Sequence, residues 1–200
     1  SSWRAAPSSI SYNSLYNGEH HDARKAAALD GWAAVGFDDS HWAAAEPADA
    51  SAASAALMSS ALFEPTRHVS ARTPQSVHAP ASRPLAQVFD FGQNMAGVLR
   101  LTGLRCAAGT NVTLRHAELL THPPYGAEDG SLYVGNLRGA QATDVYTCRG
   151  DAAGEDYTPT FTQHGFRYAE VAGEALRPLT DDQVTALEMH TDVRQHGALA

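Results

Sequence analysis

Between residues 86 and 193, short runs rich in β-branched and aromatic residues alternate with turn-forming residues. The runs are bounded by Gly, Asn, Asp or Pro and recur at near-regular spacing, which is typical of an antiparallel sandwich or barrel. The predicted strands cover residues 86–92, 97–104, 110–119, 142–150, 157–163, 166–173 and 185–193. The pattern therefore predicts an all-β fold, an antiparallel sandwich or barrel.

One of these stretches, FTQHGFRYAEV (residues 161–171), alternates imperfectly between apolar and polar residues. Gly165 interrupts the two-residue period, and a glycine inside a strand usually marks a bulge or a close backbone approach. A bulge can re-aim a side chain toward a site. The side chains of this stretch that we expect in the core are Phe161, Phe166, Tyr168 and Val171.

The first 46 residues contain few complete strands. We expect an edge strand over residues 9–16, a turn at Asn17-Gly18, and one or two helical turns over residues 22–29. Three tryptophans are large enough to anchor this segment to a core, and we expect it to pack on the sandwich through them. They are Trp3, Trp32 and Trp42.

Two other segments interrupt the strand pattern. Residues 47–84 are rich first in alanine and then in proline, a composition that predicts a linker followed by an extended connector. Residues 120–140 contain a Pro-Pro pair and turn-forming glycines, so we expect a long surface loop there. Loops of that length inside a compact domain are often functional.

Charge and composition exclude several classes of partner. The 200 residues carry 14 basic and 22 acidic side chains, a formal net charge of -8, and no basic stripe, so nucleic-acid binding has no support. No apolar run approaches the roughly 20 residues that cross a bilayer. The start, SSWRAAPSSI, has neither an initiator methionine nor the apolar core of a signal peptide. We expect a piece of a longer protein, whose secretion or other extracytoplasmic location stays open.

Neither a catalytic site nor a metal site emerges from the sequence. The spacing of the acidic residues nominates no pair of glycosidase carboxylates. The motifs EHHD (19–22) and FDDS (37–40) lack the additional spaced ligands of zinc or calcium sites. A nucleophile elbow and a phosphate-binding loop are also missing. Cys106 and Cys148 either pair or stay free, and they fix no redox compartment.

The sequence does supply the residue types of a sugar-binding surface, which needs aromatic rings for C–H faces and planar polar groups for hydroxyls. Gln93 is one residue that could supply such groups, and the candidate carbohydrate-binding residues are Asn94, Tyr125, Tyr133, Asn136, Arg138, His164 and Arg167. For His164 and Arg167 a structural alternative exists, in which they lie on the polar face of a strand and pair with Glu118 or Asp144. We favour that alternative.

Several motifs, taken together and in order, resemble the β-sandwich region of bacterial-type α-L-rhamnosidases. The motifs are VFDFGQNMAGVLRL, TLRHAELL, SLYVGNLRGAQATDVYTCRG, FTQHGFRYAEVAG and LEMHTDV. The resemblance implies a sandwich of jelly-roll or concanavalin-like type over residues 85–196. It also implies that residues 1–46 are the C-terminal part of a preceding jelly-roll domain, and that residues 47–84 connect the two.

The resemblance also implies a function for the parent protein. In this family an (α/α)6 barrel follows the sandwich and hydrolyses terminal α-L-rhamnose with inversion, using glutamates or equivalent carboxylates. No residue here matches that catalytic pair, so we expect the non-catalytic portion of such an enzyme, with the barrel and a rhamnosylated glycan as its partners. A calcium-dependent rhamnose-binding module is common in the family, but no calcium ligand is assigned here. The alternative is a stand-alone carbohydrate-binding or structural module.

Overall fold

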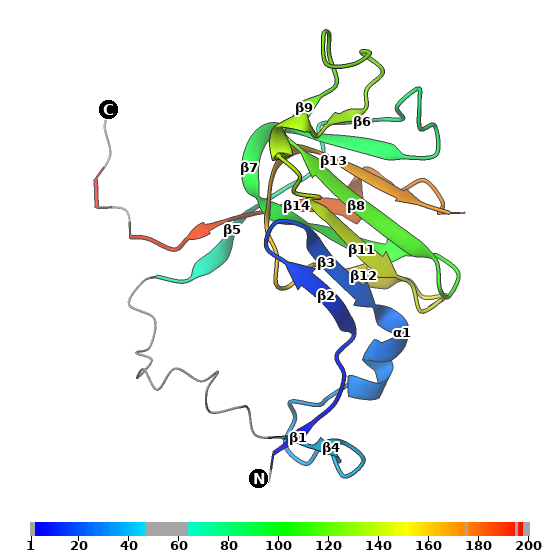
Figure 1. The fold of residues 1–200 in the computed structure, drawn as a ribbon, viewed down its shortest axis with the longest axis vertical. Coiled ribbons are helices and arrows are strands. Elements are labelled where there is room, and N and C mark those ends of the chain that lie inside the picture. The colour runs from blue at the N-terminus through cyan, green and yellow to red at the C-terminus, as the bar shows by residue number, and fades with distance from the viewer. Residues whose placement is uncertain (1–2, 47–63, 175, 195, 198–200) are drawn as a thin grey trace.

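The fold is a strongly curled β-sheet whose layers enclose one main core (Figure 1). The computed structural model describes residues 3–46, 64–174, 176–194 and 196–197. Ten strands of the described chain form one sheet in the order β2-β3-β11-β8-β13-β7-β14-β5, and β6 and β12 also pair with β7. The prediction of an all-β sandwich is confirmed. Within the described residues, pairing is antiparallel except between β3 and β11, which run parallel.

The elements have the following bounds. The N-terminal elements are β1 (Arg4–Ala5), β2 (Ile10–Ser14), β3 (Gly18–Asp22), α1 (Ala23–Ala26), the 3-10 turn η1 (Ala27–Leu29) and β4 (Ala43–Ala44). The middle elements are β5 (Thr66–Arg72), β6 (Ser76–His78), β7 (Gln87–Leu104), β8 (Asn111–Ala117), β9 (Leu119–Leu120), β10 (Leu132–Tyr133) and η2 (Gly135–Leu137). The last elements are β11 (Thr143–Thr147), β12 (Glu155–Tyr157), β13 (His164–Gly173), η3 (Asp181–Gln183) and β14 (Val184–Thr191).

Strand β7 joins the layers of the sandwich. The sequence predicts two strands here, but the structure has one, which pairs with β13 through its first half and with β14 through its second. The change of partner occurs at Gly97, which faces both His164 and Glu188. A Cβ atom at Gly97 would lie 2.2 Å from the carbonyl oxygen of Leu187, so this crossing requires glycine.

A bulge separates the two pairing regions of β7 and β13. Met95 faces Phe166 and Asp90 faces Tyr168, so residues 91–94 of β7 lie opposite Arg167 alone. The bulge expected near Gly165 is therefore present, but the extra residues belong to the partner strand. It turns Asn94 outward and leaves its side chain exposed.

The main core lies between the layers and is built from alternate residues of the central strands. Its fully buried members include Phe89, Leu99, Leu101, Leu104, Val112, Leu114, Phe166, Ala169 and Val184. Phe166 and Val171 are buried as predicted, whereas Tyr168 is half-buried against a smaller cluster of Val88, Ala117 and Leu132. The prediction for Phe161 is wrong, because its side chain is 62% exposed.

The N-terminal segment adds strands to the sheet rather than packing on it through tryptophan. The edge strand predicted over residues 9–16 is β2, and β3 inserts between β2 and β11. Trp3 and Trp32 are 77% and 62% exposed, so the expected anchoring by these rings is wrong. Trp42 is half-buried and packs edge-on against Phe37 within the same segment.

The proline-rich stretch also joins the sheet. β5 pairs with residues 186–191 of β14 at the edge, and β6 pairs with β7. The alanine-rich part of the predicted linker lies outside the described residues. The division into a preceding domain, a connector and a sandwich stays a prediction.

Cys106 and Cys148 form a disulfide across 42 positions, which resolves the alternative that the sequence left open. Tyr146 and the buried carboxylate of Glu155 lie close by, joined by a hydrogen bond of 2.8 Å. Among the described residues, no helix has both the length and the apolar character needed to span a membrane.

Candidate functional site

The predicted long loop projects from one end of the sandwich, where β9 and β10 form its base (Figure 1). Buried Leu132 ties β10 to the smaller apolar cluster. The carboxylate of Asp129 accepts hydrogen bonds from the hydroxyls of Thr121, Ser82 and Ser131 and from the Ser131 backbone N–H. These bonds, that from Ser82 first, hold the pKa of Asp129 well below its usual value. The loop is therefore fixed at its base.

Glu118, just before β9, organises the surface beside this loop. Its Oε1 accepts a hydrogen bond of 2.9 Å from the Asn94 amide, and its Oε2 accepts one of 2.8 Å from the Asn136 amide. Since a carboxylate only accepts, both amides must present their NH₂ groups to Glu118 and keep their oxygens for other donors. Two of the predicted binding residues thus meet at Glu118, which the sequence analysis suggests only as a structural partner.

Three aromatic rings continue this surface along the loop. The Tyr125 and Tyr133 ring centroids are 5.5 Å apart, and His122 lies 5.5 Å from Tyr125 and 6.0 Å from Tyr133. A Cβ atom at Gly135 would lie 2.6 Å from the Tyr133 hydroxyl, so this ring lies beside the segment that carries Asn136. Tyr125 is 64% exposed, and so offers a ring face to solvent. We call Asn94, Glu118, Asn136, His122, Tyr125 and Tyr133 together the Glu118 surface.

His164, by contrast, is buried inside the sandwich. Its Nε2 lies 3.1 and 3.2 Å from the two carboxylate oxygens of Asp144, one of the two partners expected in the structural alternative. Asp144 also accepts the backbone N–H of Glu19 at 2.9 Å. Burial opposes ionisation of Asp144, but the bond from His164 and the other donors hold the pKa of Asp144 below its usual value. His164 is therefore unavailable to a ligand at the surface.

His116 stacks on His164 at a ring distance of 4.2 Å, and both rings are buried. Its Nδ1 is 3.0 Å from the carbonyl oxygen of Ala142, which only accepts, so Nδ1 carries the proton and Nε2 is unprotonated. Burial lowers the pKa of His116 to about 3, with the nearby His164 adding to the effect. His116 is thus a neutral imidazole at ordinary pH.

His116, Asp144 and His164 bring three potential metal-ligating atoms within 4.8 Å of one another. The two imidazole planes differ by only 24° and the rings are stacked, so their in-plane lone pairs run side by side instead of converging on one ion. Two nitrogens also do not fit calcium, which takes six to eight oxygen ligands. The arrangement fits a buried hydrogen-bond network better than a metal centre.

Arg167 and Arg138 are placed differently from the Glu118 surface. Arg167 forms a bidentate ion pair with Asp90, at 2.8 and 2.9 Å, opposite the bulge of β7. Asp90 also accepts the N–H of Gly92, so the pair closes the bulge from both sides. Arg167 thus pairs with a carboxylate, but the predicted partners Glu118 and Asp144 are wrong, because Asp90 takes that place. Arg138 is exposed and has a left-handed backbone after η2.

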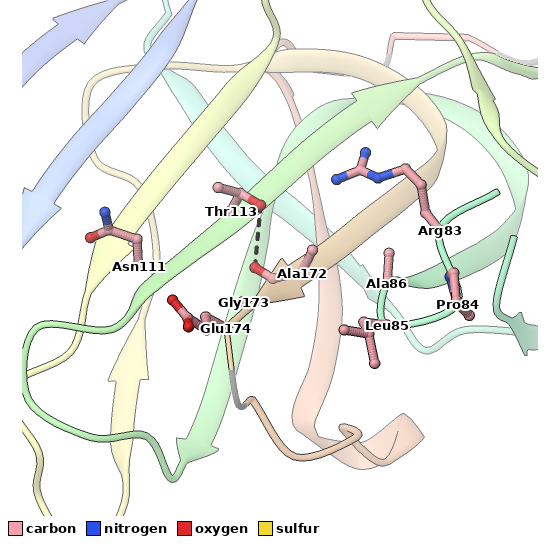
Figure 2. A pocket seen from close by; sticks show the side chains of 9 residues that line it. All are labelled: Arg83, Pro84, Leu85, Ala86, Asn111, Thr113, Ala172, Gly173 and Glu174. Atoms are coloured by element: carbon pink, nitrogen blue, oxygen red, sulfur yellow. Dashed lines mark hydrogen bonds between the residues drawn. The ribbon is translucent and has the colours of Figure 1, made fainter.

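A groove of about 530 Å³ lies elsewhere, over the outer face of β8 and β13 (Figure 2). The Thr113 hydroxyl in its floor donates to the carbonyl oxygen of Ala172. Arg83 at its wall pairs with the buried carboxylate of Glu170. The complete lining is Arg83, Pro84, Leu85, Ala86, Asn111, Thr113, Ala172, Gly173 and Glu174. It includes no aromatic ring and none of the predicted binding residues.

Comparison with known proteins identifies the family. Residues 81–190 match the bacterial alpha-L-rhamnosidase concanavalin-like domain, and residues 1–69 match the alpha-L-rhamnosidase N-terminal domain. The chain belongs to the bacterial α-L-rhamnosidase family. This membership confirms the resemblance drawn from the sequence motifs.

Individual relatives agree with the family match. An α-L-rhamnosidase of Streptomyces avermitilis is 42% identical over 189 residues, which cover 94% of this chain and 17% of that protein. One from Alteromonas sp. is 35% identical, covering 96% of this chain and 20% of that protein. The solved α-L-rhamnosidase of Dictyoglumus thermophilum superposes with a TM-score of 0.81 at 36% identity, over 95% of this chain and 20% of that one. The chain thus spans about one fifth of the length of these relatives.

Proposed function

We propose that this chain is the non-catalytic β-sandwich portion of an α-L-rhamnosidase whose catalytic (α/α)6 barrel hydrolyses terminal α-L-rhamnose from glycosides. The observation that carries the proposal is the match to two rhamnosidase domains in series, which together account for most of the chain. The relatives are about five times longer, which leaves ample length for a catalytic domain. The disulfide supports an extracytoplasmic location, because disulfides persist in oxidising compartments.

The buried carboxyls support a scaffold role for this portion. Inverting glycosidases place two carboxyl groups on opposite sides of a sugar, about 6.5–9.5 Å apart. Here Glu19, Asp144, Glu155 and Glu170 are all buried and bound to groups of the protein itself. Their hydrogen bonds join strands and loops of the sandwich, as structural carboxylates do.

The test is an assay of aryl α-L-rhamnoside hydrolysis, by the 200-residue chain and by the protein that the complete gene encodes. We expect turnover by the complete protein and none by the chain. Turnover by the chain would contradict a non-catalytic role and require a carboxylate pair within it. A complete protein without any rhamnosidase activity would favour the alternative, a stand-alone carbohydrate-binding or structural module.

A further inference from the structure

We propose that the Glu118 surface is a contact site for a neutral saccharide, and that Glu118 is its central hydroxyl-binding group. The proposal deepens the proposed function by giving the rhamnosylated glycan a place on the sandwich, and it rests on that function for the choice of sugar. The sequence predicts Asn94, Tyr125, Tyr133 and Asn136 among the carbohydrate-binding residues. The structure adds the carboxylate that joins the two asparagines.

The hydrogen-bonding capacity of this surface suits a diol. A carboxylate has about four lone-pair positions, and the two asparagine amides occupy one on each oxygen of Glu118. Each oxygen can accept one more donor, so neighbouring hydroxyls of a sugar ring can both donate to Glu118. In the part of the chain that the structure describes, no group donates to the amide oxygens of Asn94 and Asn136, which flank the carboxylate as further acceptors. Hydrogen bonds to a charged group are the stronger kind.

The aromatic part supplies the complementary apolar contact. The face of a tyrosine ring is electron-rich and attracts the polarised C–H groups on one side of a pyranose. Tyr125 presents such a ring at 64% exposure, and its contacts with His122 and Tyr133 restrict its orientation. An exposed ring held by other rings loses little conformational freedom when a ligand binds.

The backbone beneath the site is already ordered. Asp129 fixes the base of the loop that carries Tyr125, and the Arg167–Asp90 pair closes the bulge that carries Asn94. Glu118 itself lies between β8 and β9, and a Cβ atom at Gly165 would meet its carboxylate at an ordinary 3.8 Å. The groups are therefore presented together before binding, which lowers the free-energy cost of binding.

Charge selects against acidic sugars. Of the six residues of the Glu118 surface, Glu118 carries the formal charge, and the whole chain carries a formal net charge of -8. A uronate or a sulfated sugar would bring like charge to it, which is unfavourable at short range. A neutral deoxyhexose such as rhamnose provides both the adjacent hydroxyls and an apolar face.

The test uses the 200-residue chain with methyl α-L-rhamnoside as the probe, followed by saturation-transfer NMR and by ¹H–¹⁵N chemical-shift titration. We expect shifts confined to Asn94, Glu118, Asn136 and the aromatic loop. Glu118→Gln places an amide NH₂ where an acceptor is needed, and Tyr125→Ala removes the exposed ring. Each change should weaken binding at least fivefold while the far-UV circular dichroism stays unchanged.

Tyr12→Ala is the matched control, because Tyr12 is an exposed tyrosine on the edge strand β2, outside the Glu118 surface. It should bind the probe like the unmodified chain. Shifts elsewhere, no binding at all, or equal affinity in the Glu118→Gln and Tyr125→Ala variants would overturn the proposal. Absence of binding together with rhamnoside hydrolysis by the complete protein would overturn this inference and leave the proposed function intact.

Discussion

Glu19 shows how a single buried residue changes the structure of a distant segment. Its carboxylate accepts the backbone N–H groups of Thr160 and Phe161, at 3.0 and 3.1 Å, from 141 and 142 positions away. Because a side chain binds these N–H groups, they do not pair with the backbone of a neighbouring strand, and β12 ends at Tyr157. The predicted strand over residues 157–163 is therefore wrong beyond that point, and Phe161 is turned outward. Nothing in the local sequence pattern reveals so distant a partner.

The protonation of His116 makes stability depend on pH. Burial lowers its pKa in the folded chain to about 3, whereas the ordinary value is 6.5. Between these values the unfolded chain binds a proton that the folded chain does not, so the free energy of unfolding falls as the pH falls below 6.5. The slope contributed by one such group is at most about 1.4 kcal/mol per pH unit. Urea unfolding, followed by circular dichroism at pH 7, 6, 5 and 4.5, measures it.

His116→Gln removes the titrating group. Between pH 6 and 4.5 the free energy of unfolding of this variant should therefore change less steeply with pH, by the contribution of roughly one proton, even if the variant is less stable at every pH. His41→Gln is the matched control, because it makes the same replacement at an exposed histidine. The prediction fails if the slopes of His116→Gln and the unmodified chain agree.

Among the elements, β7 contributes most to the architecture. It carries the bulge that presents Asn94, and it passes between layers at Gly97. A side chain at Gly97 would press on the Leu187 carbonyl, and overpacking of this kind costs about 1–3 kcal/mol or more. We therefore predict that Gly97→Ala lowers the free energy of unfolding by about 3 kcal/mol, as measured by urea denaturation.

Gly165→Ala provides a matched comparison on the adjacent strand. A Cβ atom there has its nearest neighbour at 3.8 Å, and its backbone φ is not in the left-handed region. The substitution should be neutral or slightly stabilising, because alanine restricts the unfolded chain more than glycine does. Equal destabilisation by both substitutions would show that the close approach at Gly97 is not the cause.

The positions of the strands in the sandwich could be predicted from the two-residue alternation of apolar and polar residues, because alternate burial is a local property of a strand. β8, β11, β13 and β14 lie within or close to their predicted ranges. The continuity of β7 could not be predicted, since the bulge between its halves is held by Arg167 from another strand. Only part of the candidate site could be predicted from the sequence. Residue type suggested Asn94, Tyr125, Tyr133 and Asn136, whereas Glu118 gained significance only from its two amide neighbours in space.

At the scale of the whole molecule, the disulfide links the end of β7 to the end of β11. Closing a loop of 42 positions restricts the unfolded chain and stabilises the fold by about 4 kcal/mol in the chain-entropy account. We predict a loss of this size in the Cys106→Ala/Cys148→Ala double variant, measured by urea denaturation. Thiol titration of the denatured, unreduced protein should detect no free thiol. Two free thiols would contradict the bridge.

The N-terminal segment and the sandwich share one sheet and one polar network, so we expect them to unfold together. Removal of residues 1–63 would leave β11 without its parallel partner β3 and Asp144 without the Glu19 N–H. The donors of Thr160 and Phe161 would also lose their acceptor, and a hydrogen bond of this kind contributes about 0.5–1.5 kcal/mol.

We therefore predict that a chain of residues 64–200 is strongly destabilised or fails to unfold cooperatively, as followed by calorimetry. Removal of residues 1–8 alone deletes β1 but keeps β2, β3 and Glu19, so this shorter deletion should retain most of the stability. Equal stability of residues 64–200 and the complete chain would show that the preceding segment is an energetically separate domain. If residues 64–200 show no cooperative unfolding transition and the chain without residues 1–8 still shows one, the folding unit begins before β2, ahead of the predicted connector.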